Sequence, residues 1–229
     1  MDDFALMARP APTPQRPLLG QTLLVVEDSR FASEAVRLLA LRSGARIRRA
    51  DCIASAERHL ATYRPGVAIV DLGLPDGSGL TLIERLDGAG TRPLVVMATS
   101  GRDDAETEAL AAGADGFLPK PVESLAAFQS AILSHMPEDA CPRGPRVLPG
   151  EAVAPDPLAM REDLVRARHM LTEEQVAPAF VAAFLGGVAR TGHDRALLDG
   201  AERAMAHHGD PRPLLRSLIA ERLGSASRL

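Results

Sequence analysis

TLLVVE, at residues 22–27, is the first of five short apolar runs that decide the fold class of this 229-residue chain. An amphipathic stretch follows each run, with its apolar residues at helical spacing. Strands that alternate with helices form βαβ units, whose right-handed crossovers cover both faces of a parallel sheet. The expected strands are residues 22–27, 45–50, 67–71, 93–99 and 116–119, and the expected helices are 30–43, 53–63, 79–87, 103–112 and 122–135.

Five such units predict an α/β fold, namely a flavodoxin-like, doubly wound, five-stranded parallel sheet with strand order 2-1-3-4-5. The α/β domain is expected to span residues 20–136. Residues 1–19 precede it as a flexible, Pro-rich tail. Residues 137–157 hold six prolines and are expected to be a linker that forms neither a helix nor an inner strand. The remainder, residues 158–229, is predicted to be a small all-α region.

Amphipathic periodicity predicts four helices in this last region. The first covers residues 158–171. The second covers residues 173–190, either with a capping box formed by Thr172 and Gln175 or with a start or kink at Pro178. The third covers residues 194–208, and a fourth is expected to follow an N-cap at Asp210.

Composition excludes several classes of protein. Hydrophobic residues make up 46% of the chain, which is enough for a core, and the net charge of −4 gives no overall attraction to nucleic acid or to an anionic membrane. No apolar run reaches the ~18 residues that a membrane span needs. The N-terminal residues lack the basic and apolar segments of a signal peptide, so a cytoplasmic location is expected. Cys52 and Cys141 are expected to be reduced thiols.

Polar and charged side chains follow four of the expected strands at their carboxyl ends. In the predicted strand order these four strands are neighbours, so their ends meet at one edge of the sheet. Crowded carboxylates raise one another's pKa, and a divalent cation with oxygen ligands, such as Mg²⁺, relieves the repulsion. An acidic pair, an acceptor carboxylate, a hydroxyl and an ammonium together make a phosphoryl-transfer site. The residues are Glu27, Asp28, Asp71, Thr99, Ser100 and Lys120.

Four segments in this order resemble the receiver domain of bacterial two-component response regulators. They are VVEDSR (25–30), VDLGLPDGSGLTLI (70–83), MATSG (97–101) and GADGFLPKP (113–121). The resemblance covers residues 21–136, about half of the chain. No single segment is specific, whereas the ordered set at these spacings is. The motifs of the helical region do not identify its family.

The resemblance implies a role for each residue of the site. Asp71 is the phosphoacceptor, and Mg²⁺ is held by Glu27, Asp28 and Asp71 with the backbone carbonyl of Gly73. Lys120 contacts the phosphoryl oxygens, and the Lys120–Pro121 peptide bond is cis. Thr99 is the switch hydroxyl, although the spacing from Thr99 to Lys120 is one residue shorter than expected, so Ser100 is the alternative. Phe117 takes the position of the family's rotating aromatic residue but has no hydroxyl group.

Two further observations concern the basic residues. Lys120 is the only Lys among 26 basic residues, which indicates a position where a compact ammonium is required. Residues 151–229 contain ten Arg against eleven Asp and Glu, whereas a DNA-reading helix normally carries a basic stripe. DNA binding is therefore not expected. The histidines of this region, at positions 169, 193, 207 and 208, are interpreted as surface residues.

These observations predict a response regulator that accepts a phosphoryl group on Asp71 from a sensor histidine kinase or a histidine phosphotransfer protein. Its helical region is expected to be a protein-interaction output, packing against the receiver, a second copy of the chain or another protein. The receiver surface of the fourth and fifth helices is expected to contact this region or its twin in a second copy of the chain, so that phosphorylation changes the oligomeric state or exposes the helical faces. No enzymatic activity is expected beyond self-phosphorylation and autodephosphorylation. The alternative is a DNA-binding transcriptional regulator with an atypical helical output.

Overall fold

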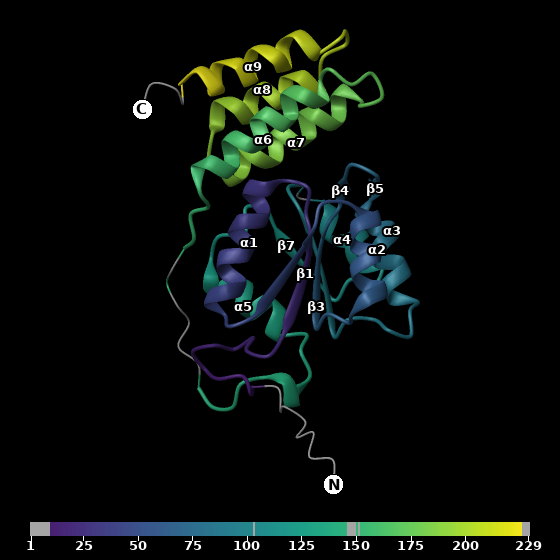
Figure 1. Ribbon diagram of the computed structural model, residues 1–229, viewed down its shortest axis with the longest axis vertical. Helices are drawn as coiled ribbons and strands as arrows, with labels where there is room; N and C mark the ends of the chain where they lie inside the picture. Colours follow the sequence, from purple (N-terminus) through teal and green to yellow (C-terminus); the bar gives the residue numbers. More distant parts are fainter. Residues whose placement is uncertain (1–9, 103, 146–149, 151, 226–229) are drawn as a thin grey trace.

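The computed structural model describes residues 10–102, 104–145, 150 and 152–225 (Figure 1). Its main sheet is five-stranded and parallel with the order β2-β1-β3-β6-β7, which confirms the predicted topology. The carboxyl ends of β1, β3, β6 and β7 therefore lie side by side at one edge. The strands are β1 (Thr22–Val26), β2 (Arg46–Ala50), β3 (Val67–Asp71), β6 (Val95–Ser100) and β7 (Gly116–Pro119).

Helices cover both faces of this sheet, as the sequence predicts. In Figure 1, α1 and α5 lie on one face and α2, α3 and α4 lie on the other. Since both faces are covered, the inner strands β1, β3 and β6 are almost completely buried and consist largely of Val, Ile, Leu, Ala and Met. The helices are α1 (Arg30–Arg42), α2 (Ile53–Thr62), α3 (Gly79–Asp87), α4 (Ala105–Ala111) and α5 (Leu125–Leu133).

Serine N-caps fix where the helices next to the strand ends begin. The Ser29 side chain accepts a hydrogen bond from the backbone N–H of Ala32 at the start of α1. Ser124 caps α5 in the same way through the N–H of Ala127. Because such caps satisfy N–H groups that have no partner within the helix, they hold the loop after β1 and the start of α1 in a defined geometry.

The C-terminal region is a separate helical layer with its own hydrophobic core. Figure 1 places this layer beyond the carboxyl edge of the sheet, above α1. Phe31 of α1 is buried within this second core. The helical region is thus anchored on the α/β domain. Its helices are α6 (Pro157–Met170), α7 (Pro178–Thr191), α8 (Arg195–Met205) and α9 (Arg212–Ser225).

One of the two predicted starts of the second helix in the helical region is wrong. The capping box of Thr172 and Gln175 does not form, because α7 begins at Pro178, where proline is favoured in the first helical turn. The Thr172 hydroxyl instead donates to the carbonyl of His169 in the preceding turn. The alternative expectation of a helix that begins at Pro178 is the one that the structure shows.

The segments flanking the α/β domain are more ordered than expected. Leu18 is fully buried in the main core, and its N–H donates to the carbonyl of Ser43, so the flexible tail does not extend to residue 19. In the linker, Val153 is buried in the same core beside an isolated bridge between Ser124 and Ala152. The linker also contains a 3₁₀ turn, η1 (Glu138–Ala140), which the prolines around it permit. Burial of the apolar side chains at these positions stabilises the two segments, although no periodic pattern in the sequence indicates that they are buried.

Candidate functional site

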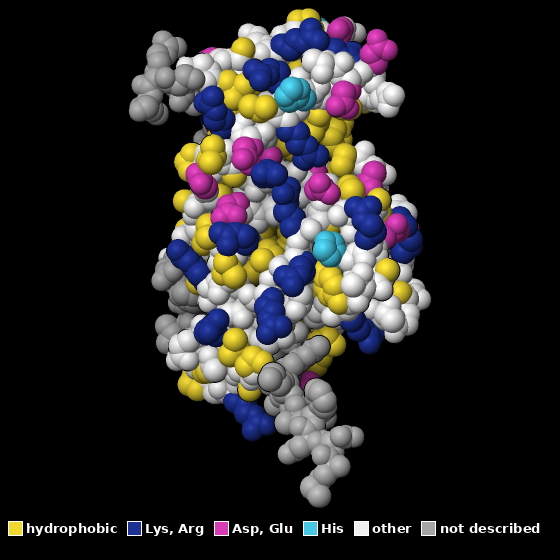
Figure 2. All heavy atoms as spheres, in the orientation of Figure 1, with side chains coloured by type: hydrophobic (Ala, Val, Ile, Leu, Met, Phe, Trp, Pro, Cys, Tyr) yellow, Lys and Arg dark blue, Asp and Glu magenta, His cyan; other side chains and the backbone are white. Residues whose placement is uncertain are grey.

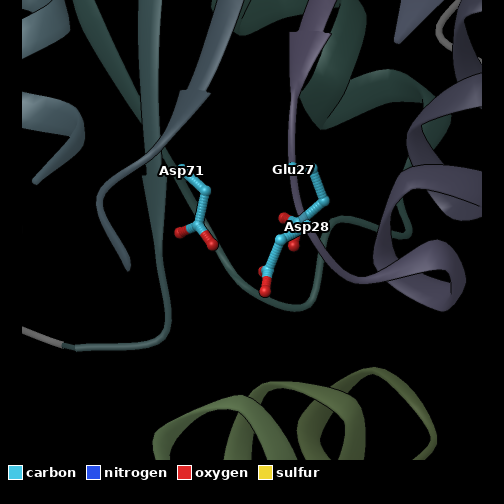
Figure 3. Close-up of side chains that lie close together, drawn as sticks. All are labelled: Glu27, Asp28 and Asp71. Carbon is cyan, nitrogen blue, oxygen red and sulfur yellow. The ribbon is translucent and has the colours of Figure 1, made fainter. Parts of the chain in front are cut away.

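Three carboxylates meet at the carboxyl edge of the sheet (Figure 3). Glu27 and Asp28 directly follow β1, and Asp71 is the last residue of β3. One carboxylate oxygen from each residue lies within 4.8 Å of the others, and all three residues are buried. β1 and β3 are parallel neighbours in the sheet, which is why residues so far apart in sequence come together here. These are the three carboxylates that the predicted strand order places at one edge.

Lys120 lies among these carboxylates. Its Nζ is 2.6 Å from Oε2 of Glu27 and 2.9 Å from Oδ2 of Asp71, and its side chain is only 8% exposed. Burial lowers the pKa of Lys120, but the negative charges of Asp71 and Glu27 outweigh this effect and raise the pKa above its ordinary value. The ammonium therefore stays charged and faces Asp71 directly. The Lys120–Pro121 peptide bond that follows is cis.

The acidic pair holds its protons more tightly than ordinary carboxyls do. Burial raises the pKa of Glu27 to about 8, although the Lys120 ammonium lowers it. Burial also raises the pKa of Asp28 to about 7, against a lowering effect of Arg166. Desolvation of this kind is relieved when a cation is bound between the carboxylates. A cation bound at the site would therefore stabilise the charged forms of these carboxylates.

The oxygen atoms present fit a hard divalent cation. Oδ2 of Asp28 is buried and accepts no hydrogen bond from the described part of the chain. The guanidinium of Arg166 lies 3.5 Å from this oxygen, too far for a good hydrogen bond, and a buried acceptor without one is costly unless a cation or water contacts it more closely. Gly73, whose carbonyl was predicted to help hold the metal, lines the same cavity as Asp28 and Asp71. Carboxylates and a carbonyl are the ligands that Mg²⁺ prefers.

The two candidate switch hydroxyls, Thr99 and Ser100, differ in their surroundings. The Thr99 hydroxyl donates to the carbonyl of Leu118 at 2.7 Å, across the β6–β7 pair. Ser100 lines the cavity beside Asp71, and its hydroxyl accepts a hydrogen bond from the N–H of Arg102 at 3.2 Å. In this arrangement Ser100 is the hydroxyl nearer to the open side of the site. Phe117 is half-buried and packs against the core on the α2–α4 face.

The helical region contributes a carboxylate, Asp163 of α6, that sequence analysis missed. Asp163 is fully buried. It accepts hydrogen bonds from the Ser29 hydroxyl at 2.7 Å and from the backbone N–H groups of Arg30 and Phe31, each at 2.9 Å. These donors begin α1 and directly follow the acidic pair. The signal in the sequence was a carboxylate beside Leu164 on the apolar side of the expected helix.

Arg166, one turn further along α6, reaches the acidic pair itself. Its guanidinium donates to the backbone carbonyl of Asp28 and lies 3.5 Å from Oδ2 of the same residue. It also stacks over the ring of Phe184 in α7, at 5.3 Å from the ring centroid. Within one chain, the expected docking of the helical region on the surface of the fourth and fifth receiver helices is therefore wrong, whereas contact of that surface with a second copy stays a prediction. The region packs chiefly on α1 and on the loop after β1, because the buried partners of Asp163 and the anchor Phe31 lie there.

A cavity of about 320 Å³ lies between the strand ends and α7. Figure 3 shows a helix of the helical region facing the three carboxylates across this space. The wall on the sheet side includes Asp71, Ser100 and Lys120, and the opposite wall includes Phe184, Gly187 and Arg190. The histidines at positions 169, 193, 207 and 208 are exposed, as expected of surface residues.

Residues 23–132 match the family model described as the response regulator receiver domain. Together with the strand order and the carboxylate–lysine site, this match decides the assignment. Residues 23–132 form a response regulator receiver domain.

Relatives share this domain over part of their length. The KDP operon transcriptional regulatory protein KdpE of Escherichia coli K12 is 30% identical over 145 residues, which cover 62% of this chain and 58% of KdpE. The virulence transcriptional regulatory protein PhoP of Salmonella typhimurium is 35% identical over 115 residues, which cover 48% of this chain and 51% of PhoP. This chain therefore spans little more than half the length of the curated relatives that it matches.

Two solved structures are similar to this chain over half of its length. A putative response regulator from Chloroflexus aurantiacus has a TM-score of 0.46 and 28% identity, covering 50% of this chain and 98% of that protein. A CheY-like response regulator receiver domain from Methylobacillus flagellatus has the same TM-score, identity and coverage.

No helix in the described part of the chain is long and apolar enough to cross a membrane.

Proposed function

We propose that the chain is a two-component response regulator whose receiver domain accepts a phosphoryl group on Asp71. The observation that carries this proposal is the buried cluster at the strand ends, where Lys120 contacts Asp71 and Glu27 beside Asp28. Burying like charges together is costly unless the site binds a ligand that uses them. The donor is a phosphohistidine on a sensor kinase or on a phosphotransfer protein.

The reaction is a phosphoryl transfer between two residues. A carboxylate oxygen of Asp71 attacks phosphorus in line, the bond between phosphorus and the imidazole nitrogen breaks, and the imidazole leaves with that electron pair. Lys120, whose Nζ lies 2.9 Å from Oδ2 of Asp71, stabilises negative charge on the transferred group. Glu27, Asp28 and Asp71 would hold Mg²⁺ with the carbonyl of Gly73, and the ion would neutralise phosphoryl oxygens. Hydrolysis of the acyl phosphate returns Asp71 to its free form, and no other enzymatic activity is proposed.

The proposed output is the helical region, acting through contacts with another protein or with a second copy of the chain. The relatives KdpE and PhoP are named as transcriptional regulators, so a DNA-binding output is the second candidate. The charge balance of the helical region argues against it, because ten Arg are offset by eleven Asp and Glu. On the face shown in Figure 2, Arg and acidic side chains are interspersed over this region. A cytoplasmic place of action stays a prediction.

The proposal is tested by incubating the full chain with phosphoramidate and Mg²⁺ and measuring phosphorylation by intact-mass spectrometry. One added phosphoryl group is expected in the parent chain and none in Asp71→Asn. Asp51→Asn is the matched control, because Asp51 is an exposed aspartate outside the cluster and its loss should change nothing. Circular dichroism shows whether Asp71→Asn is folded. Phosphorylation that persists in a folded Asp71→Asn variant would contradict the proposal.

A further inference from the structure

Arg190, near the end of α7, is a basic side chain that the helical region places over the receiver's strand ends. We propose that Arg190 binds the phosphoryl group carried by Asp71, so that the helical region completes the phosphoryl-binding site from outside the receiver domain. This inference rests on the proposed function of Asp71 as phosphoacceptor. It assigns to the helical region a direct contact with the ligand in addition to its role as output.

The guanidinium of Arg190 lies in a slot between two glycines, one from each region. A Cβ atom at Gly101, just after β6, would lie 3.0 Å from Nη1 of Arg190, and a Cβ atom at Gly186 in α7 would lie 3.3 Å from the same atom. The slot has its present width because neither position carries a side chain. Glycine inside a helix is destabilising relative to alanine, so Gly186 calls for a packing reason. Room for the guanidinium is such a reason.

The slot opens on the cavity above the phosphoacceptor. Arg190 lines this cavity together with Asp71, Ser100 and Lys120. The strand pairing places the slot beside Asp71, because Thr99 is the β6 partner of Asp71 and Gly101 lies two residues beyond Thr99 at the same edge. The volume of about 320 Å³ leaves space above Asp71 for a phosphoryl group while the helical region stays docked. A group placed there would have Lys120 on the sheet side and Arg190 on the α7 side.

The interactions of Arg190 in the structure leave it able to bind an anion. Its ion-pair partner is Glu202 of α8 at 3.6 Å, and the Glu202 side chain is 51% exposed. The Arg190 side chain is 29% exposed, and Glu202 also lines the cavity. A partly exposed ion pair at this distance is weak. A planar guanidinium offers five N–H donors that suit phosphoryl oxygens, and a doubly charged group within the cavity attracts it more strongly than a solvated carboxylate does.

Arg166 does not offer the same role. Its guanidinium is bonded to the carbonyl of Asp28 and stacked over Phe184, on the acidic-pair side of the site. Arg102 also lines the cavity, but its guanidinium pairs with Asp104 at 3.2 Å and with Glu108 at 2.6 Å. We therefore assign the second cation for the phosphoryl group to Arg190. By thermodynamic reciprocity, a phosphoryl group that binds Arg190 strengthens the docking of the helical region by the same factor. Phosphorylation is then expected to hold the helical region on the receiver and not to release it.

The test uses the full chain with Mg²⁺ and beryllofluoride, a mimic of the phosphoryl group on Asp71. Fluorine NMR or titration calorimetry measures its affinity. Arg190→Gln is expected to weaken beryllofluoride binding about tenfold or more, since a charged hydrogen bond is lost. Arg190→Lys keeps the charge and should retain most of the affinity. Arg195→Gln is the matched control, because Arg195 is 86% exposed on α8 and pairs with Asp199.

Hydrogen exchange gives a second readout that a purely structural arginine would not move. In the parent chain, beryllofluoride should slow exchange of the Arg30 and Phe31 amides, which bond to Asp163 across the interface. In Arg190→Gln this slowing should be lost. Unchanged affinity in Arg190→Gln, or equal losses in the Gln and Lys variants, would overturn the role of Arg190 while the proposed function stands. Failure of the parent chain to bind beryllofluoride would overturn both.

Discussion

Replacing Asp163 by alanine should undock the helical region from the receiver domain. The carboxylate is fully buried and accepts three hydrogen bonds, from the hydroxyl of Ser29 and the N–H groups of Arg30 and Phe31. Asp163→Ala leaves these three donors without their acceptor, and each buried polar group left unsatisfied costs about 1–3 kcal/mol. Burial raises the pKa of Asp163, so the carboxylate itself is destabilised by desolvation, and that cost disappears with it. The net loss should be about 3 kcal/mol.

The matched control is Glu162→Ala at the neighbouring position. Glu162 pairs with Arg30 at 2.8 Å, but both side chains are about half exposed, and such pairs contribute roughly 0–1 kcal/mol. Native-state hydrogen exchange of the α1 amides measures the free energy of opening at the interface, and urea unfolding measures that of the whole chain. A large effect confined to Asp163→Ala supports the account. Equal effects of the two substitutions, or a loss below about 1 kcal/mol for Asp163→Ala, would refute the reasoning.

Three further predictions concern the site and its anchor. Lys120→Arg keeps the charge but should abolish tight beryllofluoride binding, because a planar guanidinium cannot occupy the compact position of the ammonium, 2.6 Å from Glu27 and 2.9 Å from Asp71. Normal binding by this variant would show that the ammonium has no special role. Without metal, stability should fall as the pH rises from about 4 to about 8, since both carboxyls of the acidic pair have a raised folded-state pKa, about 7 for Asp28 and about 8 for Glu27. The stability that comes from their protonated forms is fully present below their ordinary pKa near 4 and is lost as the pH rises through their folded-state pKa values. Thermal melts at a series of pH values measure this dependence, and saturating Mg²⁺ should flatten it. A flat dependence without metal would contradict the assignment. Phe31→Ala should cost about 3–5 kcal/mol in urea unfolding, because the ring is buried in the core of the helical region, and a loss under about 1 kcal/mol would show that it is no anchor.

The sequence predicted the receiver domain because its signals are local and repeated. Each apolar run fixes a strand, and the strand order brings the residues at the strand ends together whatever the loops do. Glu27, Asp71 and Lys120 therefore met as expected. The burial of Leu18 was not predicted, because it depends on a distant partner, the carbonyl of Ser43, and not on a periodic pattern.

Docking of the helical region could not be predicted for a related reason. Asp163 and Arg166 occupy ordinary helical positions, and only the folded surface of α1 shows that they meet the loop after β1. Complementarity between two surfaces is a tertiary property that propensity and periodicity do not contain. The same holds for the slot of Arg190, which needs Gly101 and Gly186 from different regions. The helical region is thus where the structure adds most to the sequence.

The proposed function depends above all on Asp71 as the residue that carries the phosphoryl group. The most direct measurement is to phosphorylate the full chain with phosphoramidate and Mg²⁺, reduce the acyl phosphate with borohydride, and map the altered residue by peptide mass spectrometry. We expect one modified residue, Asp71, and loss of the modification when Mg²⁺ is withheld. Modification of a histidine, or of an aspartate elsewhere in the chain, would contradict it.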